Sequence, residues 1–433
     1  MVCLVAGTMN VLKSHRSLHV ISTSKTRSSR NDNDPSALER KARQILGWPA
    51  VFSHHNTWYN LSQWNHYIQE NKQELCRNLQ VFANSRRQPR KDNNDDPIVM
   101  ALIAGRNEGS TEDPLSEWFT LLKSIILMSS QDVLMYIATD AGSVSTLQDH
   151  CHQAQFVMEQ QQTGITIQCF VFAINKSQVQ AWRKEANLDY FDRLIDHHSG
   201  EFGAAKMFFP RVFQFPNATT TTSSSSDKDN KNDHPPMIQA DAMFMDTDMV
   251  FADDPANLWK LRRTDKTSDK ELWKMRIRPF PCSCIMIIHY DRLRQLDVHP
   301  EEGGMSSPYF SGTKTYMELL DWAVHKAHAT HRKERHPKLV GQSPYYPYHP
   351  ADKVQSFGDQ RILLSFQLIH KDVVGEIPSY WNREGARNFN YGKGYYYQLD
   401  KSGAFHENCG KQHWFVSLYE EMDLECVAGG RTK

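Results

Sequence analysis

The segment AMFMDTDMVF, from Ala242 to Phe251, ends a short hydrophobic run with two aspartates that are one residue apart. A continuous apolar run of this length predicts a strand buried on both faces, and Asp246 and Asp248 then lie at its carboxyl end. Such a pair can equally be the polar exit of an ordinary strand, because Asp is common in turns. The flanking sequence has to decide between the two interpretations.

The flanking sequence alternates between strand-like and helix-like segments. Further buried strands are predicted at PIVMALIAG (97–105), VLMYIATD (133–140), ITIQCFVFAI (165–174) and CSCIMIIHY (282–290). Helices are predicted at LSEWFTLLKSIILMSS (115–130), at FGAAKMFFPRVF (202–213, ending near Pro210) and in the charged stretch before Cys282. This alternation predicts an α/β fold: a mostly parallel, doubly wound sheet with flanking helices. Such sheets bind ligands outside the carboxyl ends of their strands, where Asp246 and Asp248 are placed.

Composition excludes some classes of protein. Lys plus Arg and Asp plus Glu both number 50 in 433 residues, so nothing in the charge favours nucleic acid or an anionic membrane as a partner. Eight cysteines in so long a chain do not indicate a disulfide scaffold. Cys282 and Cys284 form a lone C-x-C pair without a second pair at zinc spacing, and we interpret them as small core residues.

The organisation predicted from these patterns is a helical and low-complexity region over 1–96, an α/β domain over 97–425 and a tail over 426–433. The polar segment Ser22–Pro35 is predicted to be disordered and the segment Ala37–Ser85 helical. The segment 217–236, rich in Ser, Thr and Asn, is predicted to be a disordered loop insertion. The apolar start of the chain has twelve residues, fewer than the roughly twenty that span a membrane, and no membrane segment is predicted.

Two chemistries use an aspartate pair at a strand end. In a haloacid-dehalogenase-type phosphatase, the hydrophobic strand ends in D-x-D-x-T/V, which DTDMV fits. That motif normally opens its fold, however, whereas at least three strands precede it here, and FGDQRILL (357–364) lacks the second carboxylate of the later acidic pair. In a nucleotide-sugar transferase, the two carboxylates hold a divalent cation against the diphosphate, and oxygen ligands suit Mn²⁺ or Mg²⁺.

Nine motifs follow one another in a recognisable order. They are ALIAGRNEG (101–109), LLKSIILMSS (121–130), YIATDAG (136–142), GAAKMFFP (203–210), MDTDMVFADDPANLW (245–259), CSCIMIIHYDRL (282–293), FGDQRILL (357–364), PSYWNREG (378–385) and FHENCGKQHW (405–414). In this order, from about Pro97 to Met422, the chain resembles glycosyltransferase family 8, and within it the glucoside xylosyltransferases. The resemblance implies a GT-A fold and retaining transfer from a UDP-sugar with a divalent metal, usually Mn²⁺. It also implies that 97–425 is the catalytic domain and that the region 1–96 before it is stem-like.

The resemblance also implies the residues of a site. Asp246 and Asp248 match the D-x-D metal ligands, and His406 matches a third ligand that opens a C-terminal H-x-x-G-x-x-K-P-W-like motif. In this chain His406 and Trp414 keep that span, but Gly410 and Lys411 are displaced and His413 replaces the proline. The remaining donor-binding residues that the resemblance implies are Ala104, Gly105 and Arg106 for the uridine, Asp140 and Lys206 for the nucleotide or donor, and Lys411 for the diphosphate.

Departures from the family pattern concern the donor sugar. Where the family has N-[SA]-G after the D-x-D strand, this chain has Cys282, Ser283 and Cys284. The common GDQDLLN reads GDQRILL here, which keeps Asp359 and Gln360 as the implied catalytic residues. We expect Gln360 near the anomeric carbon and Asp359 on the sugar hydroxyls in a front-face mechanism, with a covalent intermediate on Asp359 as the rival. Trp381 is either an acceptor-side aromatic or a core aromatic.

The implied partners are a UDP-sugar donor, with xylose or glucose leading, and a glycan or glycoprotein acceptor. An inactive UDP-sugar-binding homologue is the alternative within the same family. Relatives that modify proteins are type II membrane proteins, so the resemblance favours the lumen of the Golgi or endoplasmic reticulum. Sequons at Asn60, Asn175 and Asn217 agree with a lumenal protein, while the missing anchor leaves a cytoplasmic enzyme as the alternative.

Overall fold

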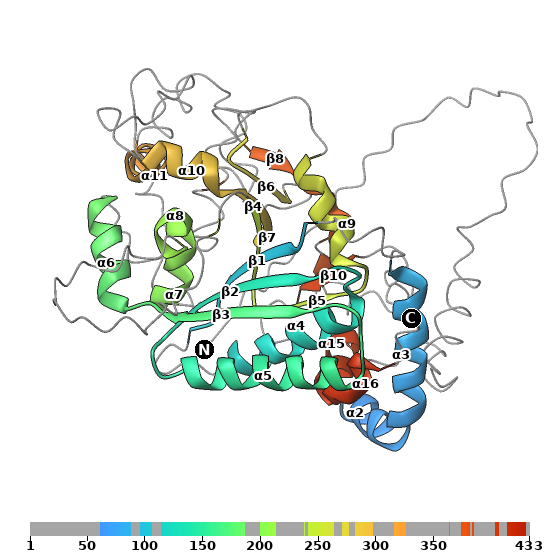
Figure 1. Cartoon of the computed structure of the whole chain (residues 1–433). Helices are drawn as coiled ribbons and strands as arrows, with labels where there is room; N and C mark the ends of the chain where they lie inside the picture. Colours follow the sequence, from blue (N-terminus) through green and yellow to red (C-terminus); the bar gives the residue numbers. More distant parts are fainter. Residues whose placement is uncertain are drawn as a thin grey trace, which may run out of the picture.

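A computed structural model of the whole chain is shown in Figure 1. It describes residues 61–87, 96–105, 114–186, 200–213, 238, 241–263, 271–276, 282–297, 316–325, 363, 374–381, 383–384, 403–406 and 414–429. Several features predicted from the sequence lie outside these ranges: the polar segment 22–35, the loop insertion 217–236, and the motif with Asp359 and Gln360.

Seven strands form one sheet in the order β3-β2-β1-β4-β7-β6-β8 (Figure 1). They are β1 (Ile98–Ile103), β2 (Val133–Thr139), β3 (Ile167–Ala173), β4 (Asp241–Met245), β6 (Trp273–Arg276), β7 (Cys282–His289) and β8 (Val374–Glu376). Within this sheet, β7 alone runs against its neighbours β4 and β6, and every other pairing is parallel. The prediction of a mostly parallel α/β sheet with flanking helices is therefore confirmed.

The direction of winding reverses between β1 and β4. From β1 the chain moves outward to β2 and β3, and it then returns to β4 on the other side of β1. At such a switch point the connections leave in opposite directions, which opens a crevice at the carboxyl ends of the two adjacent strands. The DTD segment follows β4 directly and so lies at this crevice.

The sheet separates two hydrophobic clusters, because successive side chains of a strand point to opposite faces. In β4, Met243 and Met245 belong to the cluster formed with α4 (Pro114–Met128) and α5 (Val144–Gln160), whereas Ala242 and Phe244 belong to the other. The opposite face is covered by α6 (Lys176–Glu185), α7 (Gly200–Ala205), the 3-10 helix η3 (Lys206–Phe208), α8 (Phe209–Val212), α10 (Tyr290–Asp297) and α11 (Tyr316–His325) (Figure 1).

A contact between two side chains joins the start of β4 to β7. Asp241 pairs with His289 in the antiparallel register, and its carboxylate lies 2.7 Å from His289 Nδ1. Its other oxygen lies 3.9 Å from Arg262 Nε. Both ends of this strand are therefore marked by an aspartate, since Asp246 follows its last residue.

A second, three-stranded sheet begins where the DTD segment ends. Its order is β5-β10-β9, formed by β5 (Met249–Phe251), β10 (Ala404–His406) and β9 (Arg383–Glu384). After β5 come α9 (Pro255–Trp259) and the 3-10 helix η4 (Lys260–Arg263). Asp254 starts α9, because its side chain accepts a hydrogen bond from the Ala256 backbone N–H and Pro255 suits the first turn.

The two ends of the described chain lie side by side. Helices α2 (Leu61–Glu70) and α3 (Lys72–Arg86) pack against α15 (Trp414–Glu421) and α16 (Leu424–Ala428), which in turn cover α4 (Figure 1). The predicted helical region 37–85 is confirmed over Leu61–Arg86. Within the described ranges no helix combines the length and the apolar character that crossing a membrane requires.

All six cysteines that the structure describes are paired, which the number and spacing of the cysteines did not predict. The disulfides join Cys76 to Cys426, Cys151 to Cys169, and Cys282 to Cys284. Cys282 and Cys284 are buried in β7, as expected of core residues, but they are also bonded to each other. The cysteines were underestimated because partners as far apart as Cys76 and Cys426 show no spacing motif.

Two local predictions were wrong. The segment 202–213 is not one helix that ends near Pro210. It consists of α7, η3 and α8, and Pro210 lies in the first turn of α8, where a proline needs no N–H. The charged stretch before Cys282 was expected to be helical, but β6 lies within it. This strand pairs with β7 on one side and β8 on the other, and its side chains Trp273 and Met275 are buried.

Candidate functional site

The DTD segment joins the two sheets. Asp246 continues β4 by one residue, because its backbone N–H donates to the Cys284 carbonyl of β7 at 2.9 Å. Asp248 immediately precedes β5 of the three-stranded sheet. Both aspartates are half-buried, and Thr247 between them is buried. The three residues of the DTD segment are thus the whole connection between β4 of the large sheet and β5 of the small one.

Thr247 fixes this connection to α4. Its hydroxyl donates to Glu117 Oε2 at 2.9 Å, and Glu117 lies in the first turn of α4. The space between α4 and the DTD segment holds a cavity of only about 10 Å³. Such a volume has room for one water at most, so this space does not hold a larger ligand.

Lys206 approaches the same place from the opposite layer. Its Nζ lies 2.5 Å from Asp246 Oδ1, and both side chains are 17% exposed. The position of Lys206 depends on α7, which packs directly on the end of β1: a Cβ added to Gly105 would lie 2.4 Å from the Phe202 ring. A glycine at the end of β1 therefore allows the close approach that brings α7, and then Lys206, to the end of β4.

The ends of β1 and β2 are fixed by hydrogen bonds. The Thr139 hydroxyl donates to the Ala104 carbonyl at 2.6 Å, and Ser143 Oγ donates to Asp140 Oδ2 at 2.7 Å. Ala104, Gly105, Asp140 and Asp246 are thereby placed along one carboxyl edge, as predicted. The Asp140 carboxylate holds the turn before α5, so its role is at least partly structural.

The backbone of His406 lies next to the aspartate pair although 157 residues separate it from Met249. In the antiparallel pairing of β10 with β5, His406 is opposite Met249, the residue that follows Asp248. Among the side chains that the structure describes, no three of His, Cys, Asp and Glu form a group that could hold a metal ion. The His406 side chain is outside that set, and its role as a third ligand remains a prediction.

The other implied site residues, Arg106, Lys411, Asp359 and Gln360, lie outside the described residues. Trp381 is described, and it is a core aromatic: it is 5% exposed, and a Cβ added to Gly403 would lie 2.4 Å from its ring. Of the two interpretations of Trp381, packing at the start of β10 is therefore the one that the structure supports.

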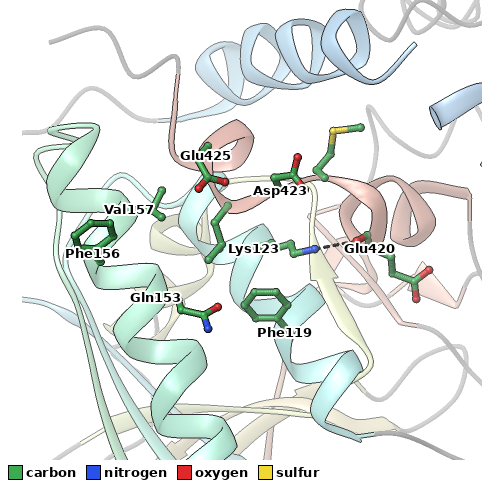
Figure 2. Close-up of a pocket in the computed structure, with 10 residues that line it drawn as sticks. Phe119, Lys123, Gln153, Phe156, Val157, Glu420, Asp423 and Glu425 are labelled. Atoms are coloured by element: carbon green, nitrogen blue, oxygen red, sulfur yellow. Dashed lines mark hydrogen bonds between the residues drawn. The ribbon is translucent and has the colours of Figure 1, made fainter. Parts of the chain in front are cut away.

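A larger cavity lies on the far side of α4 and contains none of the predicted site residues (Figure 2). It has a volume of about 440 Å³ and is lined by α4, α5 and the junction of α15 with α16. Lys123 borders it, donating to the carbonyls of Tyr419 at 3.0 Å and Glu420 at 2.9 Å. Burial lowers the pKa of Lys123 to about 8, with a smaller opposing effect from Asp423. Lys123 thus caps the C-terminus of α15.

Comparison with known proteins gives matches among solved structures alone. No family model and no curated protein matches the chain. Mouse xyloside xylosyltransferase 1, in its apo form, matches 73% of this chain and 99% of its own, at 11% identity and a TM-score of 0.42. The glycosyltransferase GlyE of Streptococcus pneumoniae TIGR4 matches 77% of this chain and 63% of its own, at 10% identity and a TM-score of 0.37.

The apo form of GlyE matches 77% of this chain and 62% of its own, at 10% identity and a TM-score of 0.39. All the matched proteins named here are glycosyltransferases. In both GlyE comparisons, this chain spans less than two thirds of the GlyE chain. Because every TM-score is below 0.5, we argue function from the residues of this chain.

Sequence reasoning missed Glu117 and the small sheet. Glu117 belongs to a helix that was predicted, but only the fold shows that its carboxylate meets Thr247. Strands β5, β9 and β10 have two or three residues each, too few for a period of two to be visible. The one sequence signal for the small sheet was the resemblance, which singled out His406.

Proposed function

We propose that the chain is a metal-dependent, retaining glycosyltransferase that moves xylose or glucose from a UDP-sugar to a sugar on a glycan or protein. The observation that carries the proposal is the position of Asp246 and Asp248. They lie one residue apart at the switch point of a doubly wound sheet, beside the ends of β1 and β2, where such sheets bind nucleotides.

The donor atoms at this point fit a hard divalent cation. Asp246 and Asp248 offer carboxylate oxygens, and His406 is attached through β10 to the neighbouring strand position. Two carboxylates and an imidazole suit Mn²⁺ or Mg²⁺ rather than a thiolate-preferring metal. When bound, the ion would neutralise charge on the diphosphate of the leaving nucleotide.

Lys206 gives the site a second positive charge. Its ammonium contacts Asp246, and the residue lies where α7 passes into η3. We propose that it turns from Asp246 toward the donor diphosphate when the nucleotide binds, so that the charge of the leaving group meets a fixed cation in a partly buried place. Ala104 and Gly105 would accept the uridine at the end of β1, with Asp140 beside them.

The chemistry at the sugar is assigned to residues outside the described ranges. We propose that Gln360 stabilises positive charge near the anomeric carbon and that Asp359 orients the sugar hydroxyls, while Lys411 contacts the diphosphate. The disulfide between Cys282 and Cys284 stands where the family pattern has an Asn that contacts the donor sugar. This replacement removes an amide from the wall of the pocket, so the donor sugar is the least constrained part of the proposal.

An oxidising compartment agrees with the proposal. Disulfides persist in the secretory pathway and are rare in the cytosol. Asn175, the asparagine of one sequon, is exposed at the start of α6. We propose the lumen of the Golgi or endoplasmic reticulum as the place of action, and glycosylation of Asn175 in secreted protein would test it.

The experiment that tests the function is release of UDP from a panel of UDP-sugars with Mn²⁺, with and without xyloside and glucoside acceptors. We expect turnover of UDP-xylose or UDP-glucose, and at least about tenfold less with GDP-sugars, equivalent to about 1.4 kcal/mol. Binding of UDP without turnover would instead identify an inactive homologue. Release of phosphate from a small phosphoester without any nucleotide sugar would identify a phosphatase.

A further inference from the structure

The segment from β10 to α16 is fastened to the rest of the molecule at three described places. At its start, β10 pairs with β5, and the Gly403 carbonyl accepts from the backbone N–H groups of Ala252 and Asp253. In its middle, the fully buried Tyr419 donates from its hydroxyl to the Phe251 carbonyl of β5 at 3.2 Å. At its end, α16 is bonded to α3 through Cys76 and Cys426.

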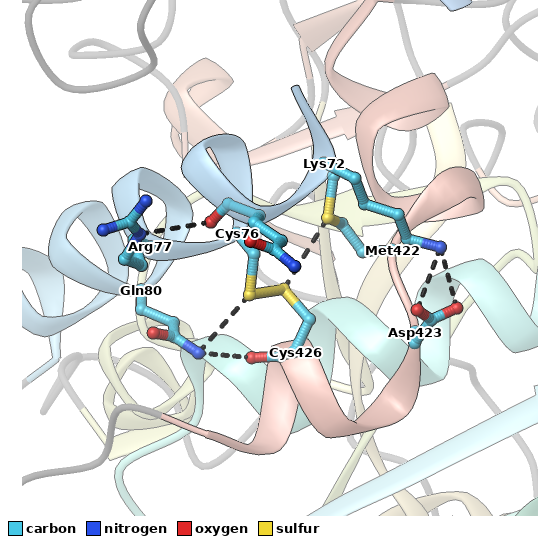
Figure 3. Close-up of a disulfide and its surroundings, with 8 residues drawn as sticks. Lys72, Cys76, Arg77, Gln80, Met422, Asp423 and Cys426 are labelled. Atoms are coloured by element: carbon cyan, nitrogen blue, oxygen red, sulfur yellow. Dashed lines mark hydrogen bonds and ion pairs between the residues drawn. A yellow bond between two sulfur atoms is a disulfide. The ribbon is translucent and has the colours of Figure 1, made fainter. Parts of the chain in front are cut away.

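The last of these attachments includes more than the disulfide (Figure 3). Gln80 donates to the Cys426 carbonyl at 2.7 Å, and Lys72 lies 2.9 Å from the Asp423 carboxylate. These contacts all join the pair α2–α3 to the C-terminal helices. The two helices of the predicted stem-like region therefore pack against the catalytic domain as part of the same structure. Lys123 adds a contact from α4 by capping α15.

We propose that the Cys76–Cys426 disulfide is a positioning element of the candidate site: it holds α15 and α16 in place and thereby keeps β10, with His406, against β5 beside Asp248. The inference rests on the proposed function for the role of His406. A strand of three residues has few hydrogen bonds of its own, so its persistence depends on what packs around it. Tyr419 makes that dependence direct, because it bonds α15 to the strand that β10 pairs with.

The test compares two disulfides in the full chain. The variant Cys76→Ser/Cys426→Ser removes the proposed positioning element, and Cys151→Ser/Cys169→Ser removes the disulfide between α5 and β3, neither cysteine of which belongs to the C-terminal segment. Hydrogen exchange of the backbone amides in Gly403–His406 is the first readout. We expect about tenfold faster exchange in the first variant and no change in the second, although both lower the melting temperature.

Affinity for Mn²⁺, measured by titration calorimetry with saturating UDP, is the second readout. We expect the dissociation constant to rise about fivefold or more in Cys76→Ser/Cys426→Ser and to stay within about twofold in the control pair. A general loss of stability would affect both variants alike, so the difference between them isolates positioning. If the first variant does not fold, Lys72→Met, which removes the contact to Asp423, should accelerate the same amides about twofold.

Unchanged exchange in Gly403–His406 would overturn the inference. So would faster exchange with an unaltered affinity for Mn²⁺, because β10 would then not carry a ligand. If the wild-type protein binds no Mn²⁺ while exchange still accelerates, the proposed function fails but the attachment of β10 through α16 stands. The two failures are therefore distinguishable.

Discussion

The seven-stranded sheet and the three-stranded sheet of this protein are built in opposite ways. In the large sheet, β1, β2 and β3 follow one another along the chain with helices between them, and each is a long apolar run. In the small sheet, strands of two or three residues come from positions near 250, 384 and 405. The candidate site lies at the join, with Asp246 on the large sheet and Asp248 on the small one.

Because of this difference, the two halves of the candidate site depend on different parts of the fold. The half that ends β1, β2 and β4 is supported by the main core, in which these three strands are buried over most of their length. The half that carries Asp248 and His406 is supported by the C-terminal helices and their attachments. Variants can therefore be chosen to act on the DTD segment that joins the two sheets, on the contact between α4 and α15, on the large sheet, or on none of these.

Asp248→Asn should have the largest effect, because it removes one carboxylate charge at the join without changing the shape of the side chain. We expect metal-dependent turnover to fall by about 10²–10³-fold, as when a directed electrostatic contact is lost, with little change in melting temperature. His406→Ala should act in the same direction. Asp149→Asn, on the exposed face of α5, is the matched control. Normal turnover by both site variants would contradict the assignment of the metal ligands.

Lys123 offers a way to measure how strongly α4 is coupled to the helices that support the small sheet. Burial lowers its pKa in the folded protein to about 8, below the usual value near 10.5. Between these two pH values the unfolded chain binds more protons than the folded chain, so stability should rise with pH, by an amount on the order of 3 kcal/mol. Below pH 8 the Lys123 side chain is protonated in both the folded and the unfolded chain, so it makes no contribution to the change of stability with pH.

The measurement is urea unfolding of the wild type and of Lys123→Met at several pH values between 7 and 10.5. The rise should be missing in Lys123→Met and preserved in Lys260→Met, which removes an exposed lysine. Parallel curves for the wild type and Lys123→Met would show that this ammonium is not desolvated in the folded protein.

Gly105→Ala tests the large sheet alone. The added Cβ would lie 2.4 Å from the Phe202 ring, so α7 has to move away from the end of β1. We expect a loss of about 1–3 kcal/mol in the free energy of unfolding, together with weaker nucleotide binding through the displaced Lys206. Gly142→Ala is the control, because its Cβ would meet only a side-chain oxygen at 3.2 Å. Equal effects of the two substitutions would argue against this role for Phe202.

The smallest effect is expected outside both sheets. The segment 217–236 has a composition that cannot bury enough apolar surface to offset the entropy of ordering it. Replacing it with a short Gly-Ser connection should leave melting temperature and turnover almost unchanged. A loss of expression or of turnover would show that this segment contributes to the fold or to the site.

The sequence was most informative where structure is local. Continuous apolar runs identified β1 to β4 and β7, and helical spacing identified α4, because these patterns lie within one segment. The alternation of strands and helices predicted that Asp246 lies at the carboxyl edge of the sheet, whereas Asp140 and Lys206 were singled out by the resemblance. In β6, Trp273 and Met275 alternate with Lys274 and Arg276, but four residues are too few for a period of two to be recognised within a charged stretch, so the strand was missed.

What the sequence could not indicate depends on contacts between distant segments. The hydrogen bond from Thr247 to Glu117 and the disulfide between Cys76 and Cys426 join residues 130 and 350 positions apart. Neither belongs to a spacing motif. The resemblance to a family supplied His406 where periodicity was silent, and the register of β10 against β5 is the structural observation that makes this residue worth testing.

The contact between Asp241 and His289 has a consequence for the aspartate at the other end of β4. Asp241 and Asp246 are five positions apart, about 17 Å of extended chain, and both are hydrogen-bonded to β7. Inserting or deleting a single residue in this strand would exchange the faces of Met243 and Phe244, or else release one of the two ends. The length of β4 therefore determines how far Asp246 projects from the edge of the sheet. A substitution near His289 that shifts this strand would move Asp246 and so alter the binding of a ligand there.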